Sequence, residues 1–246
     1  MLKLRLVTTL MFVDGVLFRT KKFVPDYFYT INFVDLNLTD EVNLIDISRD
    51  RKPELFHPIL ERFATSPLPV MVGGGISSVE EARQMMHNFA VDAFIIGRAA
   101  SERFIGQLAN KIGSQSVIGA VDFGAEDTHR VVNRAVKLVK WGAGGVYLQS
   151  IERDGSLRGY DTDKIKELSL SVNVPITAGN GCGNWQQLVE GYNAGASCCA
   201  LTSIFHHTAT SLKAARQACI EAGLPMRTLE TCQENVEHLE SDFGQR

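Results

Sequence analysis

The stretches LPVMVGGG at Leu68–Gly75 and VPITAGNG at Val174–Gly181 are two versions of one pattern, an apolar run that ends in a glycine loop. Their equivalent glycines, Gly73 and Gly179, stand 106 residues apart. After each stretch a polar segment leads to a second apolar run, AFIIG in the first copy and CCALTS in the second, at the same spacing. Internal repetition of this kind indicates a duplicated architecture. The sequence therefore predicts two similar halves, each with a glycine loop at a matching place.

Apolar runs bounded by turn residues predict eight strands, several of them apolar on both faces, as is typical of parallel strands covered by helices. The segments between them have helical spacing, for example after Ser78, which suits a helix cap. The pattern is weakest in the first crossover, residues 31–39. Eight strand–helix units predict the fold class α/β, a (β/α)8 TIM barrel with a two-fold half-barrel repeat, and the duplication favours this closed ring over an open doubly wound sheet. The expected strands are residues 4–12, 42–47, 69–72, 92–96, 116–122, 145–149, 174–178 and 198–202.

The composition is that of an ordinary globular protein, with 246 residues of which 45% are hydrophobic and 22% charged. No linker separates the halves, so we expect one barrel domain at 1–230 and a polar tail at 231–246, helical or disordered. A net charge of -3 does not indicate binding to nucleic acid or to an anionic membrane. No apolar stretch reaches about 18 residues and no signal peptide is seen, so a cytoplasmic location is expected. Five cysteines without a CxxC pair predict reduced thiols and no metal site.

The glycine loops of the repeat indicate anion binding. In barrels of this kind the active site lies at the C-terminal ends of the strands, where these loops fall. Glycine allows backbone N–H groups to approach a phosphate closely, and an arginine adds a charged donor. Two clusters at matching positions favour phosphate binding over tight turns alone, and they predict a ligand with two anionic groups. The clusters are Gly73, Gly74, Gly75, Gly97 and Arg98 in the first half, and Gly179, Asn180, Gly181, Thr202 and Ser203 in the second.

The runs VGGGI at 72–76, GSQSV at 113–117 and IERDGSLRGYD at 151–161 carry a family resemblance. From Leu4 to about Glu230 the chain resembles the cyclase subunit of imidazole glycerol phosphate synthase, a histidine-biosynthesis (β/α)8 barrel built from two half-barrels. The resemblance implies an enzyme without a cofactor that forms a heterodimer with a glutaminase. Ammonia released by the glutaminase would cross the barrel core and attack a phosphorylated small-molecule substrate, in the family a nucleotide with two phosphates.

The same resemblance implies two catalytic aspartates, at the ends of the first and fifth barrel strands. Asp122 matches the second, but Met11 stands at the first position, and methionine cannot give or take a proton. Asp14 lies three residues further along in a turn. Asp46, at the end of the second barrel strand, is a better substitute acid unless it is only a rim residue. By the resemblance, the further substrate contacts are Arg19, Ser150, Asp154 and Gly155.

The resemblance also implies a ring of charged residues that gates ammonia at the N-terminal mouth of the barrel. Arg5 and Glu41 match two members of this ring, whereas the other two fall at Ala93 and Gly145. The alternative for Arg5 and Glu41 is a plain stabilising ion pair. Asp92 matches a family residue that contacts the glutaminase.

Other departures bear on function. The Gly97–Arg98 pair and Gln149 differ from the family's residues, and the loop after the first strand is short and aromatic. These features resemble a branch of the family encoded with surface-polysaccharide genes, which works with a glutaminase and a sugar amidotransferase. Three hypotheses therefore stay open: an ammonia-using subunit that acts on another phosphorylated or sugar substrate, a genuine histidine-pathway cyclase, and a non-catalytic scaffold that conducts ammonia and activates a glutaminase.

Overall fold

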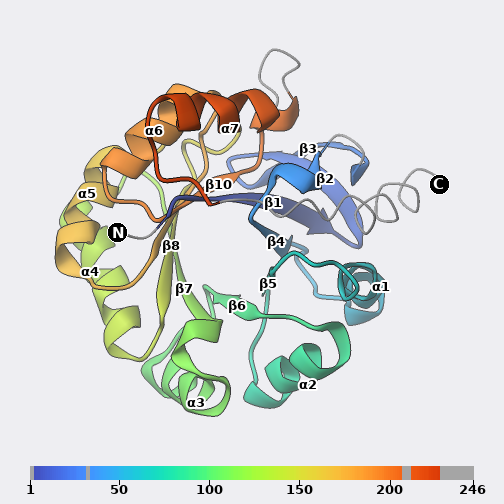
Figure 1. Ribbon diagram of the computed structural model, residues 1–246. Helices are drawn as coiled ribbons and strands as arrows, with labels where there is room; N and C mark the ends of the chain where they lie inside the picture. Colours follow the sequence, from blue (N-terminus) through green and yellow to red (C-terminus); the bar gives the residue numbers. More distant parts are fainter. Residues whose placement is uncertain (1–2, 32–33, 207–211, 228–246) are drawn as a thin grey trace.

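The computed structural model describes residues 3–31, 34–206 and 212–227, and within them eight parallel strands close into a ring. The last strand pairs with the first, with Arg5 beside Cys198, so the predicted barrel is confirmed (Figure 1). The ring strands, in order, are β1 (Arg5–Val13), β4 (Glu41–Asp46), β5 (Val70–Gly73), β6 (Ala93–Ile96), β7 (Val117–Phe123), β8 (Gly145–Ser150), β9 (Ile176–Gly179) and β10 (Cys198–Leu201).

Helices surround this ring and follow the strands in sequence (Figure 1). The helix after Ser78 begins at the cap that the sequence predicts. The Ser78 hydroxyl accepts the backbone N–H of Glu81 at 3.1 Å, which satisfies one of the unpaired donors of the first turn. The helices are α1 (Pro53–Phe63), α2 (Val79–Phe89), α3 (Glu102–Ile112), α4 (Thr128–Lys140), α5 (Thr162–Ser171), α6 (Trp185–Asn193) and α7 (Leu212–Glu221), with the short 3-10 helices η2 (Leu36–Leu38), η3 (Ser114–Ser116) and η4 (Ile204–His206).

The first crossover contradicts the expectation of eight helices, because the described residues between β1 and β4 hold no α-helix. They form an antiparallel hairpin, β2 (Val16–Lys21) and β3 (Val24–Phe28), and the single turn η2. The side chain of Asp35 accepts the Asn37 N–H, which stabilises a turn rather than a longer helix. The run expected to be an aromatic loop is therefore largely strand, and β2 extends the sheet from β1. The tail at 231–246 lies outside the described residues.

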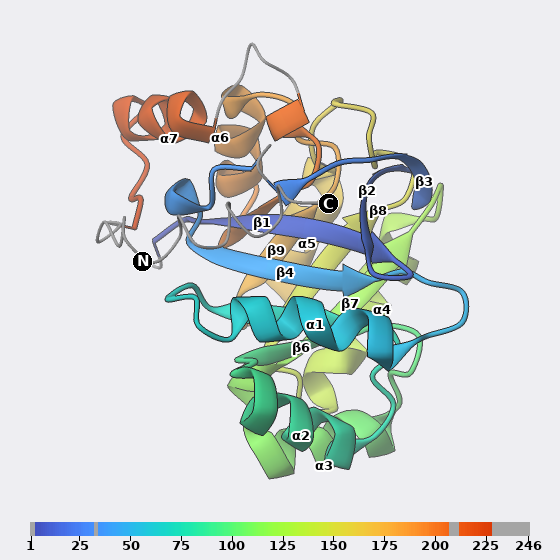
Figure 2. The same ribbon diagram turned by 90° about the vertical axis from the view of Figure 1, so that its right-hand side faces the viewer.

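Alternation along the strands divides the core into two clusters. On β1, Leu6, Leu10 and Phe12 face the surrounding helices, whereas Val7 and Met11 belong to the interior of the ring. The interior is thus filled by side chains, as in barrels of this class. Figure 2 shows that β1 and β4 point toward the end of the barrel where the β2–β3 hairpin lies. That end is the C-terminal face, where the site is expected.

Candidate functional site

A cavity of about 350 Å³ opens at the C-terminal ends of the strands, a size that suits a small molecule. Its lining comes from both sides of the ring, including β1, β4 and β7, and from the hairpin turn. The structure therefore brings together one predicted glycine cluster, both positions of the expected catalytic pair and three arginines. The polar and site-related lining residues are Met11, Phe23, Asp46, Ser48, Arg49, Arg51, Gly73, Gly74, Gly75, Gly97, Arg98, Asp122 and Gln149.

Asp122 lies near the end of β7 with its carboxyl in this cavity. Gln149 donates from Nε2 to Asp122 Oδ1 at 3.0 Å. Although Asp122 is exposed at the cavity, partial loss of water around its carboxyl raises the pKa of Asp122 above its ordinary value, and Arg98 and the Gln149 hydrogen bond both oppose the shift. A carboxyl that keeps its proton to higher pH is suited to general acid–base work.

Met11 is 2% exposed on β1 and lines the same cavity. Of the two substitute acids, only Asp46 reaches it, and its Oδ1 accepts the backbone N–H of Ser48 at 2.9 Å. Asp14 instead forms an ion pair with Lys52 at 2.9 Å and is not among the lining residues. The cavity thus holds two carboxylates, but the position facing Asp122 from β1 is apolar.

The first glycine cluster is shaped by close backbone packing. Gly74 has a φ of +103°, and a Cβ there would lie 2.1 Å from the carbonyl oxygen of Asp46. Two arginines that the sequence interpretation did not single out, Arg49 and Arg51, line the cavity beside this loop. Arg51 pairs with Glu81, but its Nε and Nη2 atoms are buried without hydrogen-bond partners among the described residues. Both arginines could have been found from the basic run directly after the second barrel strand.

The second glycine cluster has different surroundings and does not line this cavity. Asn180, Thr202 and Ser203 are buried, and the Gly159 N–H donates to the Gly181 carbonyl at 2.8 Å, so the β8–α5 loop covers the cluster. Asn180 Oδ1 and Ser203 Oγ have no hydrogen-bond partner in the described part of the chain. The structure therefore separates the two predicted clusters, and phosphate binding by the second stays a prediction.

Three of the four remaining predicted substrate contacts hold the hairpin. Asp154 is 2% exposed, and its Oδ2 accepts the backbone N–H of Phe23 at 3.0 Å. Arg19 donates to Asp26 at 2.9 Å and to the carbonyl of Gly155 at 3.3 Å. The carbonyl of buried Ser150 accepts from Asn180 Nδ2 at 3.4 Å. In this arrangement the hairpin is bonded to the β8–α5 loop.

Similarity to known proteins agrees with this geometry. The model of the histidine biosynthesis protein family matches residues 7–211. The chain belongs to the histidine biosynthesis protein family. It is 34% identical over 233 residues to the imidazole glycerol phosphate synthase subunit HisF of Chloroherpeton thalassium, with 87% of this chain and 93% of the relative covered. It is 32% identical over 234 residues to HisF of Chlorobium limicola, with the same coverage.

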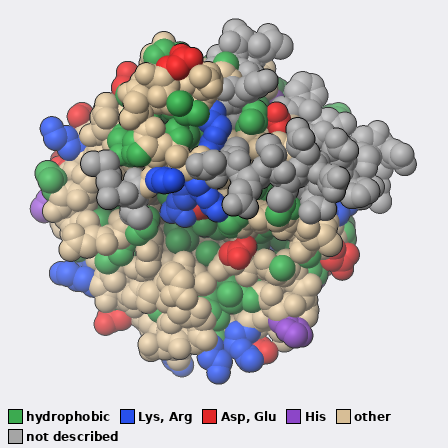
Figure 3. All heavy atoms as spheres, in the orientation of Figure 1, with side chains coloured by type: hydrophobic (Ala, Val, Ile, Leu, Met, Phe, Trp, Pro, Cys, Tyr) green, Lys and Arg blue, Asp and Glu red, His purple; other side chains and the backbone are tan. Residues whose placement is uncertain are grey.

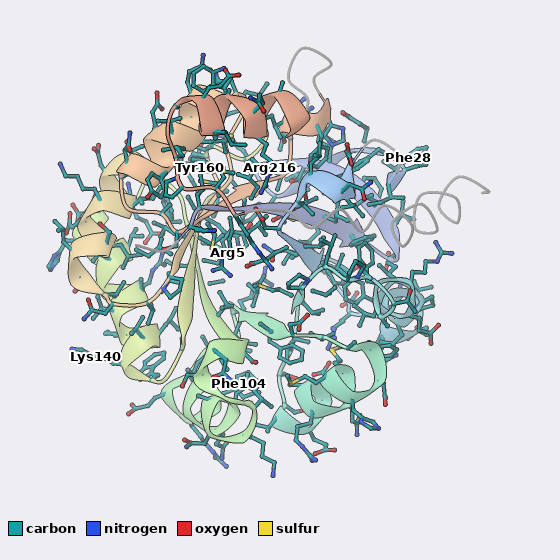
Figure 4. All side chains as sticks on the ribbon, in the orientation of Figure 1. Arg5, Phe28, Phe104, Lys140, Tyr160 and Arg216 are labelled. Atoms are coloured by element: carbon teal, nitrogen blue, oxygen red, sulfur yellow. The ribbon has the colours of Figure 1, made fainter. Side chains whose placement is uncertain are left out.

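At the opposite face of this HisF-like barrel, Arg5 forms an ion pair with Glu41 and donates to Cys198 Sγ at 3.0 Å. Arg5 projects toward the centre of the ring in Figure 4, and basic side chains lie near that centre in Figure 3. Burial raises the pKa of Glu41 despite the neighbouring guanidinium. Asp92 is exposed, and its Oδ2 accepts the Val70 N–H at 2.8 Å. Arg5, Glu41 and Asp92, which the sequence analysis assigns to the N-terminal mouth, therefore lie on that face of the barrel.

Between the two faces, Tyr147 crosses the interior of the HisF-like barrel. Its strand, β8, is separated from β1 by β9 and β10, yet the Tyr147 hydroxyl lies 3.2 Å from Thr9 Oγ1. Asn43 donates from Nδ2 to the same Thr9 oxygen at 3.2 Å. A buried polar layer therefore lies between the ion pair at the base and the cavity at the mouth.

Among the described residues, no group of three or more His, Cys, Asp or Glu side chains could hold a metal ion. Within those same ranges, no helix has the length and apolar character needed to cross a membrane.

Proposed function

We propose that this chain is the barrel subunit of a glutamine-dependent synthase and that it acts on a phosphorylated or sugar substrate other than the histidine-pathway nucleotide. The observation that supports this proposal is that Asp122 on β7 and Met11 on β1 lie on opposite strands of the ring and line the same cavity. The histidine-pathway reaction cleaves its nucleotide and closes a ring, and these two steps need protons moved on two sides of the substrate. A thioether cannot supply one of those transfers.

The chemistry that remains supports a simpler reaction. Neutral ammonia attacks carbon as a nucleophile, and the positively charged nitrogen must then lose a proton. One carboxyl can accept that proton, and Asp122 is the group placed for it, with Gln149 fixing its orientation. Asp46 is the second acidic side chain in the cavity, and in its protonated carboxylic acid form it is our candidate for the proton donor to the leaving group.

The glutaminase partner is part of the proposal. The matched HisF relatives are named as subunits of imidazole glycerol phosphate synthase, and a subunit requires a partner. We place the docking face at the N-terminal mouth, around the pair of Arg5 and Glu41 and the exposed Asp92. The buried layer at Tyr147 and Thr9 would then be the narrowest part of an ammonia path. Because the departures from the family resemble the branch encoded with surface-polysaccharide genes, we propose sugar amidation in surface-polysaccharide synthesis as the reaction.

Turnover of the histidine-pathway nucleotide distinguishes the proposed function from that of a genuine histidine-pathway cyclase. Purified protein supplied with ammonium salt is expected to leave the ribulosyl-aminoimidazole-carboxamide nucleotide unchanged, and Met11→Asp is expected to create activity. Turnover by the unaltered protein at the rate of an ordinary cyclase would make it the genuine histidine-pathway enzyme and would overturn the proposal.

The scaffold alternative is separated by Asp122→Asn in the complex with the glutaminase and a sugar amidotransferase. Loss of a general base lowers turnover by about 10²–10⁴-fold. Asp163→Asn, an exposed change on α5, is the matched control and should keep full activity. If the Asp122→Asn complex aminates its sugar at the unaltered rate, the barrel is a scaffold.

A further inference from the structure

The β2–β3 hairpin carries most of the exposed apolar side chains among the described residues. Seven large apolar side chains are exposed in those ranges, and four of them belong to the hairpin. A fifth lies beside the turn between β1 and β2, where an added Cβ on Gly15 would be 2.8 Å from its carbonyl oxygen. Single exposed apolar residues are ordinary, whereas a cluster marks an interaction surface. The five are Val16, Val24, Tyr27, Phe28 and Leu55.

Two phenylalanines form the centre of this surface. Phe18 on β2 is paired with Phe28 on β3, and their ring centroids are 6.4 Å apart. Val16 lies on the same side of β2 as Phe18, because side chains two residues apart on a strand share a face. Phe28 is 72% exposed, and Figure 4 shows it at the outer rim of the barrel. We call Val16, Phe18, Phe28 and the neighbouring Leu55 the hairpin face.

The free edge of β3 is poorly suited to pairing with another strand. Pro25 has no N–H to donate, and the strand register shifts between Arg19 and Thr20. Proline and bulges are devices that protect sheet edges from further pairing. The turn of the hairpin is also held from the cavity side, where Asp154 accepts the Phe23 N–H. A partner is therefore expected to pack on the hairpin face and not to extend the sheet.

The turn end of the hairpin has an excess of positive charge. Three cations share two acids there, and the side chains of Lys21 and Lys22 are 55% and 61% exposed. The ion pairs join Arg19 and Lys21 to Asp26, and Lys22 to Glu152. This end of the hairpin face therefore attracts an acidic surface.

The other end, where β2 begins, has the opposite sign. Lys52 pairs there with Asp14 at 2.9 Å. The charges of Asp50 and Glu54, both exposed, act on the same lysine. Three acids thus surround one cation. A surface with opposite charges at its two ends complements a copy of itself turned by a two-fold rotation, because each turn end then meets a β2 start.

We propose that the hairpin face is the contact between two copies of this chain related by a two-fold axis. Phe18 and Phe28 of each copy pack at its centre, and the basic turn end of one copy lies against the acidic β2 start of the other. A parallel arrangement would set like charges together at both ends, which disfavours it. Phe23 lines the cavity from the inner side of the hairpin, so the contact leaves the cavity open. The inference goes beyond the proposed function and does not rest on it.

Sedimentation equilibrium of the full chain at micromolar concentration tests the contact. The unaltered protein should have twice the 27.1 kDa mass of one chain. Phe28→Glu should give the single-chain mass, because association would bury an unpaired carboxylate. Leu170→Glu is the matched control, since Leu170 is 82% exposed on α5, and it should keep the dimer. Thermal denaturation would show that both variants fold.

A charge exchange tests the arrangement of the two copies. One variant combines Lys21→Glu with Lys22→Glu, and the other combines Asp50→Lys with Glu54→Lys. Each should weaken self-association at least tenfold, because like charges then meet at both ends of the contact. An equimolar mixture of the two should form mixed dimers within about threefold of the original affinity, since the new charges are again complementary. Misfolded variants would not be rescued by mixing.

Three results would overturn the inference. The first is a single-chain mass for the unaltered protein at concentrations up to about 1 mM, where even a weak dimer forms. The second is a dimer that Phe28→Glu leaves intact, which would place the contact on another surface. The third is a single chain that binds a purified glutaminase and loses this binding in Phe28→Glu, which would assign the hairpin face to that partner. None of these measurements requires nitrogen transfer, so the proposed function stands or falls separately.

Discussion

Removing the Thr9 hydroxyl tests the polar layer that crosses the barrel. Thr9, Asn43 and Tyr147 are each 1% exposed, and Thr9 Oγ1 contacts both of the other side chains at 3.2 Å. Thr9→Val keeps the shape but removes the atom shared by two buried groups. Leaving buried polar groups unsatisfied costs about 1–3 kcal/mol.

Tyr147→Phe is the matched partner, because it removes only the phenol oxygen. Thr9 keeps its bond from Asn43, so the cost should fall to about 0.5–1.5 kcal/mol, the net value of one hydrogen bond. Thr9→Val should therefore destabilise more than Tyr147→Phe.

Urea unfolding of both single variants and the double variant measures the coupling between them. Since the two side chains share a bond, the double variant should lose less stability than the sum of the single losses, by more than about 0.5 kcal/mol. Additive losses would refute the reasoning, because they would show that Tyr147 does not bond to Thr9 across the interior. An ammonia path would then not be interrupted at this layer.

Three other outcomes are expected. Gly74→Ala should destabilise by at least about 1–3 kcal/mol in thermal denaturation, because its φ is +103° and the added Cβ meets a carbonyl oxygen, whereas Gly124→Ala, with open space around it, should not. Partial desolvation raises the pKa of Asp122 in the folded state, so its ionisation opposes folding; because the side chain is exposed, Asp122→Asn should be only slightly more stable than the parent, with a gain in urea unfolding that grows as pH rises above about 4 and vanishes below it. Arg216→Met should lower the free energy of unfolding by about 3–5 kcal/mol in the same assay, because it leaves the carboxylate of Asp40 buried without its charged partner. Asp40 is 1% exposed and is bonded to Arg216 at 3.1 Å (Figure 4). A loss under about 1 kcal/mol would contradict a buried ion pair.

Much of the fold could be predicted because it depends on local patterns. Apolar runs placed all eight ring strands to within two residues, since period and turn residues are written along the chain. The hairpin was missed because the segment from Val16 to Phe28 is rich in both aromatic and charged residues, and it becomes strand by pairing with β1. Strand propensity depends on such neighbours more than helix propensity does.

The candidate site could also be predicted only in part. The family resemblance and the half-barrel repeat predict the positions of Asp122 and Met11, and the structure places both at one cavity. Arg49 and Arg51 were not identified, because a basic run after a strand reads equally well as solvated surface. Asp154 could not be assigned from its motif, since a buried carboxylate serves a ligand or a backbone N–H equally well, and its partner Phe23 lies 131 residues away.

The sequence by itself determined a duplicated ring of strands, a glycine loop in each half, and Asp122 and Met11 at corresponding strand ends of the two halves. These follow from residue identity and spacing, which are local. Only the tertiary structure decided which glycine loop opens into the cavity, because that depends on where the hairpin of one half docks on the other. The symmetry of the chain is thus a property of its sequence, and the asymmetry of its mouth is a property of contacts between residues far apart in it.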